Sequence, residues 1–364
     1  MMKRIKVIIP LIALIVCLSV IGTIYVITTI RPKEVAVGLP RVGVDGNKLV
    51  DEDNNIVTLK GVSIADPYRL DDYDHYFCEE IFAELSDWNI NVVRIPIHPG
   101  WWQAEGDYAQ KYLDPVVSWG EKYGFYIILD WHAIGNPLTG ETQNPGWKEG
   151  RYTVYNSSLQ LAESAWTELA KRYGGNSSVI FELFNEPASL SGQSVDWREW
   201  RDKLTGLIDK IRTFAPNTLI LVSGWQWTYD LRGFATYPIE RGDIAYVAHV
   251  YPNHKEWEYY FGFLSYTHPV IVTEWGFSPT VSLTEHYYGT RENFGEPFLR
   301  YMEDKNISWI AWCFHPTWQP NMITNWNFEL TEEGRLVKQA LVANSTLPTV
   351  LSKLPLTRLL LSEK

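Results

Sequence analysis

Cysteine is scarce in this 364-residue chain, which contains Cys17, Cys78 and Cys313 and no others. Cys17 lies in an apolar run near the N-terminus, so two cysteines remain for the rest of the chain. Domains that depend on disulfides for their stability usually carry more. The sequence therefore excludes a disulfide scaffold, and it leaves either one bridge between Cys78 and Cys313 or two free, buried thiols.

Positive charge is also in short supply. The chain has 32 Lys and Arg residues against 43 Asp and Glu residues, which gives a net charge of -11 at pH 7. Proteins that bind nucleic acid usually present a basic surface to the phosphates. The charge balance therefore predicts that nucleic acid is not a partner.

Motifs that bind phosphate or metal are missing as well. No G-x-G-x-x-G or G-x-x-x-x-G-K-S/T segment follows a candidate strand. There is no H-E-x-x-H motif and no Cys/His set with the spacing of a zinc site. We therefore expect neither a metal nor an organic cofactor.

Residues 7–30 contain no charge and follow three basic residues, Lys3, Arg4 and Lys6. A membrane-spanning helix needs roughly 20 apolar residues, whereas a cleaved signal peptide has a shorter apolar core and small residues before the cut. The sequence predicts a single N-terminal transmembrane helix within residues 1–34, which anchors the rest of the chain at the outer cell surface. A cleaved signal, which would release a secreted protein, is the alternative.

The chain lacks a low-complexity linker, a charge block or a repeat between residues 39 and 342. We therefore predict one domain at residues 35–346, because α/β barrels of about 250 residues or more are ordinary single domains. A C-terminal tail at residues 347–364 has no functional interpretation. The oligomeric state is left open.

Short apolar runs rich in β-branched and aromatic residues alternate with amphipathic stretches. Eight candidate strands cover residues 57–64, 91–97, 126–130, 179–183, 218–222, 244–248, 270–273 and 307–311. The helical patterns between them include residues 77–88, 159–173, 197–214 and 291–305. This alternation predicts an α/β fold with a parallel sheet, and the eight repeats favour a closed (β/α)8 TIM barrel over an open, doubly wound sheet.

Polar residues follow the candidate strands at the end where barrels of this type carry their chemistry. They are Arg94 near the end of the second strand, Asp130 and His132 at the third, Asn185 and Glu186 at the fourth, His249 and Tyr251 at the sixth, Glu274 at the seventh and Trp312 at the eighth. Each residue alone fits a structural role, such as a salt-bridged arginine or a packed tryptophan. Their joint placement predicts one cavity lined by segments that are distant in sequence.

Aromatic residues are abundant, with 17 Trp, 21 Tyr and 14 Phe in the chain. Rigid rings of this kind suit the apolar C–H faces of sugar rings. Nine tryptophans in or beside the loops that follow the strands are candidate stacking platforms: Trp101, Trp102, Trp131, Trp147, Trp225, Trp227, Trp275, Trp318 and Trp326. A row of such platforms would indicate a polysaccharide rather than a monosaccharide as the partner.

Glu186 and Glu274 follow different strands, so a barrel would place them on opposite walls. Glycoside cleavage requires such a pair, because one carboxyl group protonates the leaving oxygen while the other attacks the sugar or activates water. A separation of about 5 Å gives retention of configuration, and roughly 6.5 to 9.5 Å gives inversion. The sequence does not fix this distance, and ordinary ion pairs are the alternative role for both residues.

Three motifs resemble glycoside hydrolase family 5, a family of retaining barrel glycosidases: Val93-Arg94-Ile95-Pro96, Asn185-Glu186-Pro187 and Thr273-Glu274-Trp275-Gly276. The resemblance covers roughly residues 42–340, including an opening segment where the family has a hairpin before the first strand. It implies Glu186 as the acid/base, Glu274 as the nucleophile, Asn185 as a donor to the sugar 2-hydroxyl, Arg94 and Tyr251 as groups that orient and ionise the nucleophile, His132 and His249 as residues that line the site, and Trp312 as the platform beneath the sugar.

One position departs from the family pattern. Many members follow the histidine at position 132 with a second His or an Asn, whereas this chain has Ala133. The resemblance therefore carries no subsite contact over to that position.

The resemblance makes β-1,4-glucan, as in cellulose, the expected substrate of a retaining endo-β-glycosidase. An endo-β-1,4-mannanase, an enzyme for mixed-linkage glucan and an exo-acting β-glucosidase are the alternatives on the same site. A surface-anchored carbohydrate-binding protein on an inactive barrel is an alternative of a different class. The presence of both glutamates together with Arg94, Asn185 and Tyr251 favours the enzyme.

Overall fold

The structure is a computed structural model that describes residues 38–143, 155–189, 191–192, 194–280 and 285–343. The chain divides into two units, Met1–Val37 and Gly38–Lys364. The predicted membrane segment at residues 7–30 and the tail at residues 347–364 lie outside the described residues. Within the described part of the chain, no helix is both long enough and apolar enough to cross a membrane.

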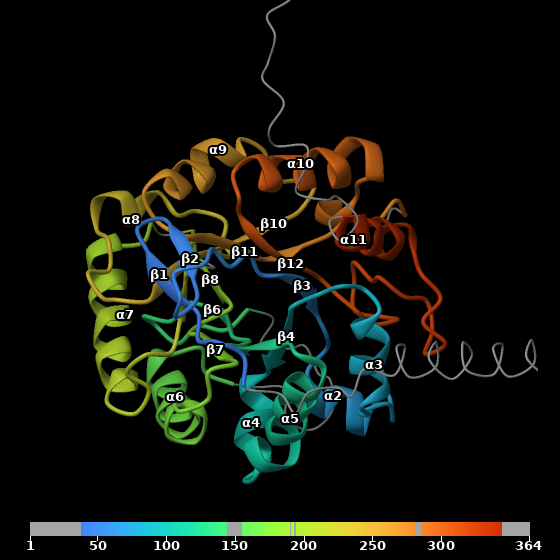
Figure 1. The fold of residues 1–364 in the computed structure, drawn as a ribbon. Coiled ribbons are helices and arrows are strands. Elements are labelled where there is room, and N and C mark those ends of the chain that lie inside the picture. The colour runs from blue at the N-terminus through green and yellow to red at the C-terminus, as the bar shows by residue number, and fades with distance from the viewer. Residues whose placement is uncertain (1–37, 144–154, 190, 193, 281–284, 344–364) are drawn as a thin grey trace, which may run out of the picture. The chain divides into compact units, whose positions relative to one another are not determined.

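Eight parallel strands close into a barrel, as the sequence pattern predicts (Figure 1). The strands are β3 (Lys60–Ser63), β4 (Val92–Ile97), β5 (Tyr126–Trp131), β7 (Val179–Glu182), β9 (Ile220–Ser223), β10 (Ile244–Val250), β11 (Val270–Trp275) and β12 (Ser308–Ala311). Pairing between β12 and β3 closes the barrel. All eight candidate strands are confirmed, and the open, doubly wound sheet is excluded.

Helices form a ring around the strands (Figure 1). They are α2 (Pro67–Asp72), α3 (Glu80–Ser86), α4 (Pro99–Ala104), η1 (Ala109–Leu113), α5 (Asp114–Tyr123), α6 (Leu159–Tyr173), α7 (Trp197–Arg212), α8 (Arg232–Thr236), α9 (Trp257–Tyr260), η2 (Gly262–Tyr266), η3 (Glu285–Tyr287), η4 (Arg291–Gly295), α10 (Glu296–Asp304) and α11 (Glu332–Ala343). The predicted helix at residues 159–173 matches α6, whereas the one at residues 291–305 is divided into a short π-helix, η4, and α10.

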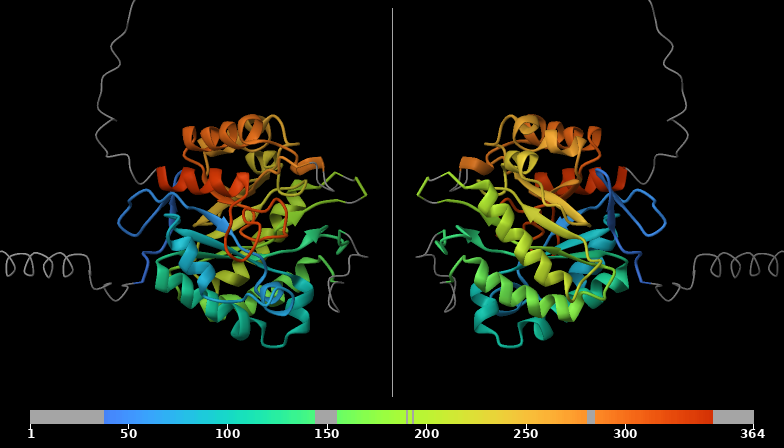
Figure 2. Two further views of the ribbon diagram at one scale, coloured as in Figure 1. Left: turned by 90° about the vertical axis from the view of Figure 1, so that its right-hand side faces the viewer. Right: turned by 90° about the vertical axis from the view of Figure 1, so that its left-hand side faces the viewer.

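A hairpin precedes the barrel, as the family resemblance implies. Its strands are β1 (Gly43–Asp45) and β2 (Lys48–Val50), and Gly46 turns the chain with a φ of 58°, which glycine adopts without steric strain. Leu49 of the hairpin belongs to the apolar cluster that fills the barrel. Figure 2 shows the hairpin at the opposite end of the barrel from the short strands β6 (Ile134–Gly135) and β8 (Glu186–Pro187).

Alternation along the strands creates a polar layer above an apolar one. Outward residues pack against the helices in one large cluster, while a second cluster contains the inward residues Val92, Ile128, Ile180, Val247, Ile271 and Ile310. Two positions further along each of these strands, the sequence places Arg94, Asp130, Glu182, His249, Thr273 and Trp312. Because side chains two positions apart on a strand point to the same face, the polar residues lie above the inward apolar layer, at the carboxyl ends of the strands.

The two cysteines beyond the N-terminal unit are free thiols. Cys313 is buried, and Cys78 is half-buried. The expectation of two free thiols is confirmed, apart from the partial exposure of Cys78, and the alternative of one bridge is wrong.

Candidate active site

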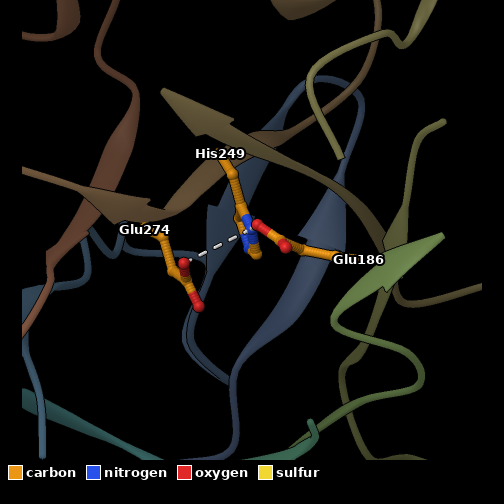
Figure 3. Close-up of side chains that lie close together, drawn as sticks. All are labelled: Glu186, His249 and Glu274. Carbon is orange, nitrogen blue, oxygen red and sulfur yellow. Dashed lines mark hydrogen bonds and ion pairs between the residues drawn. The ribbon is translucent and has the colours of Figure 1, made fainter. Parts of the chain in front are cut away.

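Glu186 and Glu274 face each other across the open end of the barrel, with His249 between them (Figure 3). One carboxylate oxygen from each glutamate and one ring nitrogen of His249 all lie within 4.8 Å of one another. The Glu186 side chain is 14% exposed and that of Glu274 is 5% exposed. The two carboxyl groups therefore share one small space, and Glu186 is the more accessible of the two.

An irregularity in β11 brings Glu274 into this space. Ala248 pairs with Val272, but the next residue, His249, pairs with Glu274, so Thr273 is an extra residue opposite β10. A bulge of this kind re-aims a side chain relative to the regular alternation. As a result, both Thr273 and Glu274 contact residues of the site, Thr273 through His249 and Glu274 through Arg94.

Each carboxylate oxygen of Glu274 accepts one strong hydrogen bond. Arg94 Nη1 donates to Oε1 at 2.8 Å, and the Tyr251 hydroxyl donates to Oε2 at 2.8 Å. Burial alone would raise the pKa of Glu274, but the charges of His249, Arg94 and His132 and the Tyr251 hydrogen bond lower it. Glu274 is therefore held ionised and in a fixed orientation.

Arg94 is the centre of a fully buried ion network. Its guanidinium contacts Glu182 through Nε at 2.7 Å, and its Nη2 lies 2.9 Å from Asp130 and 2.7 Å from Asn185 Oδ1. Burial would lower the pKa of Arg94, but Asp130, Glu182 and Glu274 raise it well above its usual value. A buried charge is stable only when its partners are in place, so this network locks the strand ends together.

The orientation of the Asn185 amide follows from its partner. Arginine only donates hydrogen bonds, so the atom of Asn185 that faces Arg94 must be the oxygen. The amide nitrogen then points away from Arg94 and is left to donate to a ligand. The backbone of Asn185 is fixed by a hydrogen bond to the Trp131 carbonyl at 2.9 Å.

Three aromatic rings form one wall of the site. His132 stacks on Trp312 with ring centroids 5.3 Å apart and planes 5° apart, and Trp318 stacks on Trp312 at 5.7 Å. His132 Nδ1 bonds Asp130 at 2.6 Å, and Trp312 Nε1 donates to the Gln319 carbonyl at 3.2 Å. These bonds fix the ring planes, and the two indole rings give the site a flat apolar surface of the kind that sugar rings contact.

His249 carries a proton rather than a free lone pair toward the glutamates. Burial would lower its pKa, but the charge of Glu274 and the nearby carboxylates of Glu182, at 3.7 Å, and Glu186, at 3.0 Å, raise it to about 10. A metal-binding histidine must offer an unprotonated nitrogen. The donor types of the Glu186, His249 and Glu274 cluster are those of a metal site, and a metal ion bound there would have to displace this proton from His249.

The position after His132 is used by the backbone rather than by a side chain. Ala133 is buried, and its carbonyl accepts a hydrogen bond from the Glu186 backbone N–H at 3.0 Å. This bond belongs to the pairing of β6 with β8. The segment that departs from the family pattern therefore positions the backbone of Glu186.

The prediction about tryptophan platforms is wrong for four of the nine residues. Four of the nine are at most 4% exposed and belong to the core: Trp101, Trp131, Trp225 and Trp275. Trp102, Trp318 and Trp326 are half-buried, and Trp227 is 40% exposed. Trp147 lies outside the described residues. The correction reflects the barrel itself, because large rings at the strand ends also fill the gap between strands and helices.

All eight predicted site residues come together at this end of the barrel, but two buried neighbours were not predicted. Glu182 and Thr273 are fully buried, and Thr273 Oγ1 donates to Glu182 Oε1 at 2.8 Å. Sequence reasoning missed Glu182 because it ends an otherwise apolar strand. Glu182 lies two positions after Ile180, which points inward, so strand alternation could have predicted that Glu182 also points into the barrel.

The barrel with two facing carboxylates at the carboxyl ends of its strands defines the class of the protein as a glycoside hydrolase. Comparison with protein families matches residues 50–317 to Cellulase (glycosyl hydrolase family 5). The chain therefore belongs to glycosyl hydrolase family 5.

Individual relatives agree with this assignment. An endoglucanase of Clostridium saccharobutylicum is 26% identical, and the match covers 74% of this chain and 55% of the relative. The cellulase CelDZ1 of a Thermoanaerobacterium species is 25% identical, and the match covers 78% of this chain and 72% of the relative. The β-glucanase SdGluc5_26A of Saccharophagus degradans, solved in complex with cellotetraose, is 31% identical with a TM-score of 0.78, over 84% of this chain and 94% of that one. The chain thus spans only about half the length of some relatives.

Proposed function

We propose that the protein is a retaining endo-β-1,4-glucanase in which Glu186 is the acid/base and Glu274 the nucleophile. The observation that carries this proposal is the approach of the two carboxylates to within 4.8 Å. Retaining glycosidases place their carboxyl groups about 5 to 5.5 Å apart, whereas inverting enzymes need roughly 6.5 to 9.5 Å to admit a water molecule. The space between Glu186 and Glu274 therefore favours direct attack on the sugar.

In the first step, Glu274 attacks the anomeric carbon while Glu186 gives its proton to the departing glycosidic oxygen. The bond between the anomeric carbon and the leaving oxygen breaks as the bond to a Glu274 oxygen forms. Arg94 and Tyr251 hold the attacking carboxylate, and the amide nitrogen of Asn185 donates to the sugar 2-hydroxyl. Trp312 supports the apolar face of the same sugar, and His132 lines the wall beside it.

In the second step, Glu186 acts as a base. It takes a proton from a water molecule, whose oxygen attacks the anomeric carbon and releases Glu274 as a carboxylate. Two inversions at the same carbon restore the original β configuration. This sequence uses only carboxyl chemistry and requires no cofactor.

The names of the relatives support a β-glucan substrate. The relatives include endoglucanases, and the similar β-glucanase was solved with cellotetraose. The exposed Trp227 also fits an extended chain, because the backbone N–H of Trp227 bonds the carbonyl of Pro187, directly after Glu186. A ring at that place can contact a sugar on the leaving-group side of the cleaved bond.

Hydrolysis of carboxymethylcellulose, β-mannan and xylan by the full-length protein tests the proposed substrate. We expect the wild type to cleave the glucan and Glu274→Ala to be inactive on all three. Cleavage of mannan in place of glucan would keep the mechanism and change the substrate. A folded wild type that cleaves none of these polymers and no aryl glycoside would contradict the proposal and favour a binding protein.

We propose further that residues 7–30 anchor the enzyme at the cell surface with the barrel outside. The support is the charge-free run and the basic residues before it. Fractionation of cells that express the full chain should place the protein in membranes, with the barrel accessible to added protease. A shortened protein in the medium would instead show that the segment is a cleaved signal.

A further inference from the structure

A chain of hydrogen bonds runs from Glu182 through Thr273 to His249. Thr273 Oγ1 lies 2.8 Å from Glu182 Oε1 and 3.1 Å from His249 Nε2. The other ring nitrogen, Nδ1, lies 3.0 Å from Glu186 Oε1. All of these atoms except the Glu186 carboxylate belong to buried side chains. The chain therefore links the Arg94 network to the acid/base of the proposed function.

The direction of each bond in the chain is fixed by chemistry. Glu182 receives two hydrogen bonds from Arg94. Burial would raise the pKa of Glu182, but Arg94 and His249 together outweigh burial and lower it to about 2. An ionised carboxylate only accepts, so the hydroxyl of Thr273 must donate to Glu182. Thr273 Oγ1 is then an acceptor for His249, and Nε2 of His249 must carry a proton.

The direction of these hydrogen bonds determines which ring nitrogen of His249 can exchange a proton with Glu186. With Nε2 protonated, Nδ1 is the nitrogen that can gain or lose a proton, and it faces Glu186. If the pair of Nδ1 and Glu186 lost its last proton, a lone pair and a carboxylate would face each other at 3.0 Å. That arrangement is repulsive, so the contact favours the state in which the pair holds one proton.

We propose that Thr273 and Glu182 are positioning residues that fix the tautomer of His249, so that the proton which Glu186 donates to the leaving group is shared with Nδ1 of His249. This inference rests on the proposed function. In the first step the shared proton moves to the leaving oxygen, and both Glu186 and Nδ1 are left without it. In the second step the proton from water restores the pair, so the proton count balances over one turnover.

Other titratable groups surround the pair. Besides the glutamates already named, the groups that interact with the charge of Glu186 or His249 include Tyr155, Tyr251, His254, His286 and Tyr287. Burial raises the pKa of the three tyrosines and lowers that of His254 to about 4. Burial also lowers the pKa of His286. These groups are therefore neutral across the pH range in which the shared proton titrates.

Thr273→Val and Thr273→Ser test the inference in the full chain. Valine has the shape of threonine without the hydroxyl, so Nε2 loses its acceptor at 3.1 Å and keeps only Glu182 Oε1 at 3.7 Å, beyond hydrogen-bond distance. The neutral ring can then place its proton on Nδ1 instead. After the shared proton has left, the remaining ring proton can sit on Nδ1 and form a hydrogen bond to the Glu186 carboxylate. Loss of the shared proton therefore becomes easier in the valine variant. Serine keeps the hydroxyl and is the matched control.

We expect the alkaline limb of the kcat/KM profile to move to lower pH by about one unit in Thr273→Val and to stay in place in Thr273→Ser. For aryl β-cellobiosides, the valine variant should lose about tenfold to 100-fold with a phenol leaving group, which needs the acid, and less than threefold with dinitrophenol. A loss of equal size on both substrates with an unmoved pH profile would show a merely structural role and overturn the inference. Inactive wild type would refute the proposed function instead.

A measurement on the wild-type protein tests the same inference without requiring that a Thr273 variant folds. Nitrogen NMR of the protein labelled at histidine, with His249 assigned from His249→Gln, reports which ring nitrogen is protonated. We expect Nε2 to stay protonated up to the highest pH at which the protein is folded. An unprotonated Nε2 in the neutral ring would overturn the inference, whatever the variants show.

Discussion

Tyr251→Phe removes one hydrogen bond to the nucleophile and changes little else. The hydroxyl lies 2.8 Å from Glu274 Oε2, and the other oxygen keeps its bond from Arg94. A hydrogen bond to a charged group contributes about 1.5 to 3 kcal/mol. If the bond persists in the transition state, its loss lowers kcat/KM by about 10- to 150-fold.

The same change has a signature in the pH profile. The Tyr251 hydrogen bond is one of the interactions that lower the pKa of Glu274 against the effect of burial. Its removal raises that pKa, so ionised Glu274 is lost at a higher pH when the solution is acidified. We expect the acidic limb of kcat/KM to move up by about 1 to 2 pH units.

An aryl cellobioside with a good leaving group is the suitable substrate, because it isolates the attack by Glu274. Tyr287→Phe is the matched control, since its ring packs edge-on against Tyr251 at 4.9 Å. We expect Tyr287→Phe to leave the acidic limb unmoved. An unmoved limb and less than a threefold loss in Tyr251→Phe would refute the reasoning about the nucleophile.

Three further predictions concern stability and substrate contact. Glu182→Gln leaves part of the buried Arg94 charge uncompensated, so chemical denaturation should show a loss of about 3 kcal/mol in the free energy of unfolding, and an unchanged midpoint would contradict this. Trp227→Ala should raise KM for cello-oligosaccharides about fivefold and leave kcat nearly unchanged, because an exposed ring contact contributes about 1 kcal/mol; an unchanged KM would place the sugar elsewhere. Glu333 is buried, and its two oxygens have no hydrogen-bond partner among the residues that the structure describes, so burial raises its pKa well above the usual value. A raised folded-state pKa means that stability falls as pH rises above the unfolded-state value, so Glu333→Gln should increase the free energy of unfolding more at pH 8 than at pH 5, and an equal gain at both would be evidence against this account.

Much of the fold was accessible from the sequence because the barrel repeats one simple pattern. Each strand is a short apolar run, and polar residues follow it at the same end, so the sequence alone places Arg94, Glu186 and Glu274 at one end of the barrel. The limits of the elements were less certain. The segment at 291–305 looks like one helix, but it begins as a π-helix that a threonine caps.

The finer features of the site depend on register and packing. The bulge at Thr273 shifts the pairing of His249 to Glu274, and nothing in the local sequence shows that shift. The separation of the two carboxylates is a sum of many such offsets, so the sequence does not determine it. Trp101 and Trp227 are both tryptophans near strand ends, and only the packing of neighbouring helices makes one buried and the other exposed.

The stereochemistry of the first product tests the central claim most directly. Proton NMR can follow the anomeric signals while the full-length enzyme cleaves cellotetraose, before the sugar mutarotates. The close approach of Glu186 and Glu274 predicts that the β-anomer of the new reducing end appears first and the α-anomer later by mutarotation. Initial appearance of the α-anomer would show inversion and contradict the assignment of Glu274 as a nucleophile.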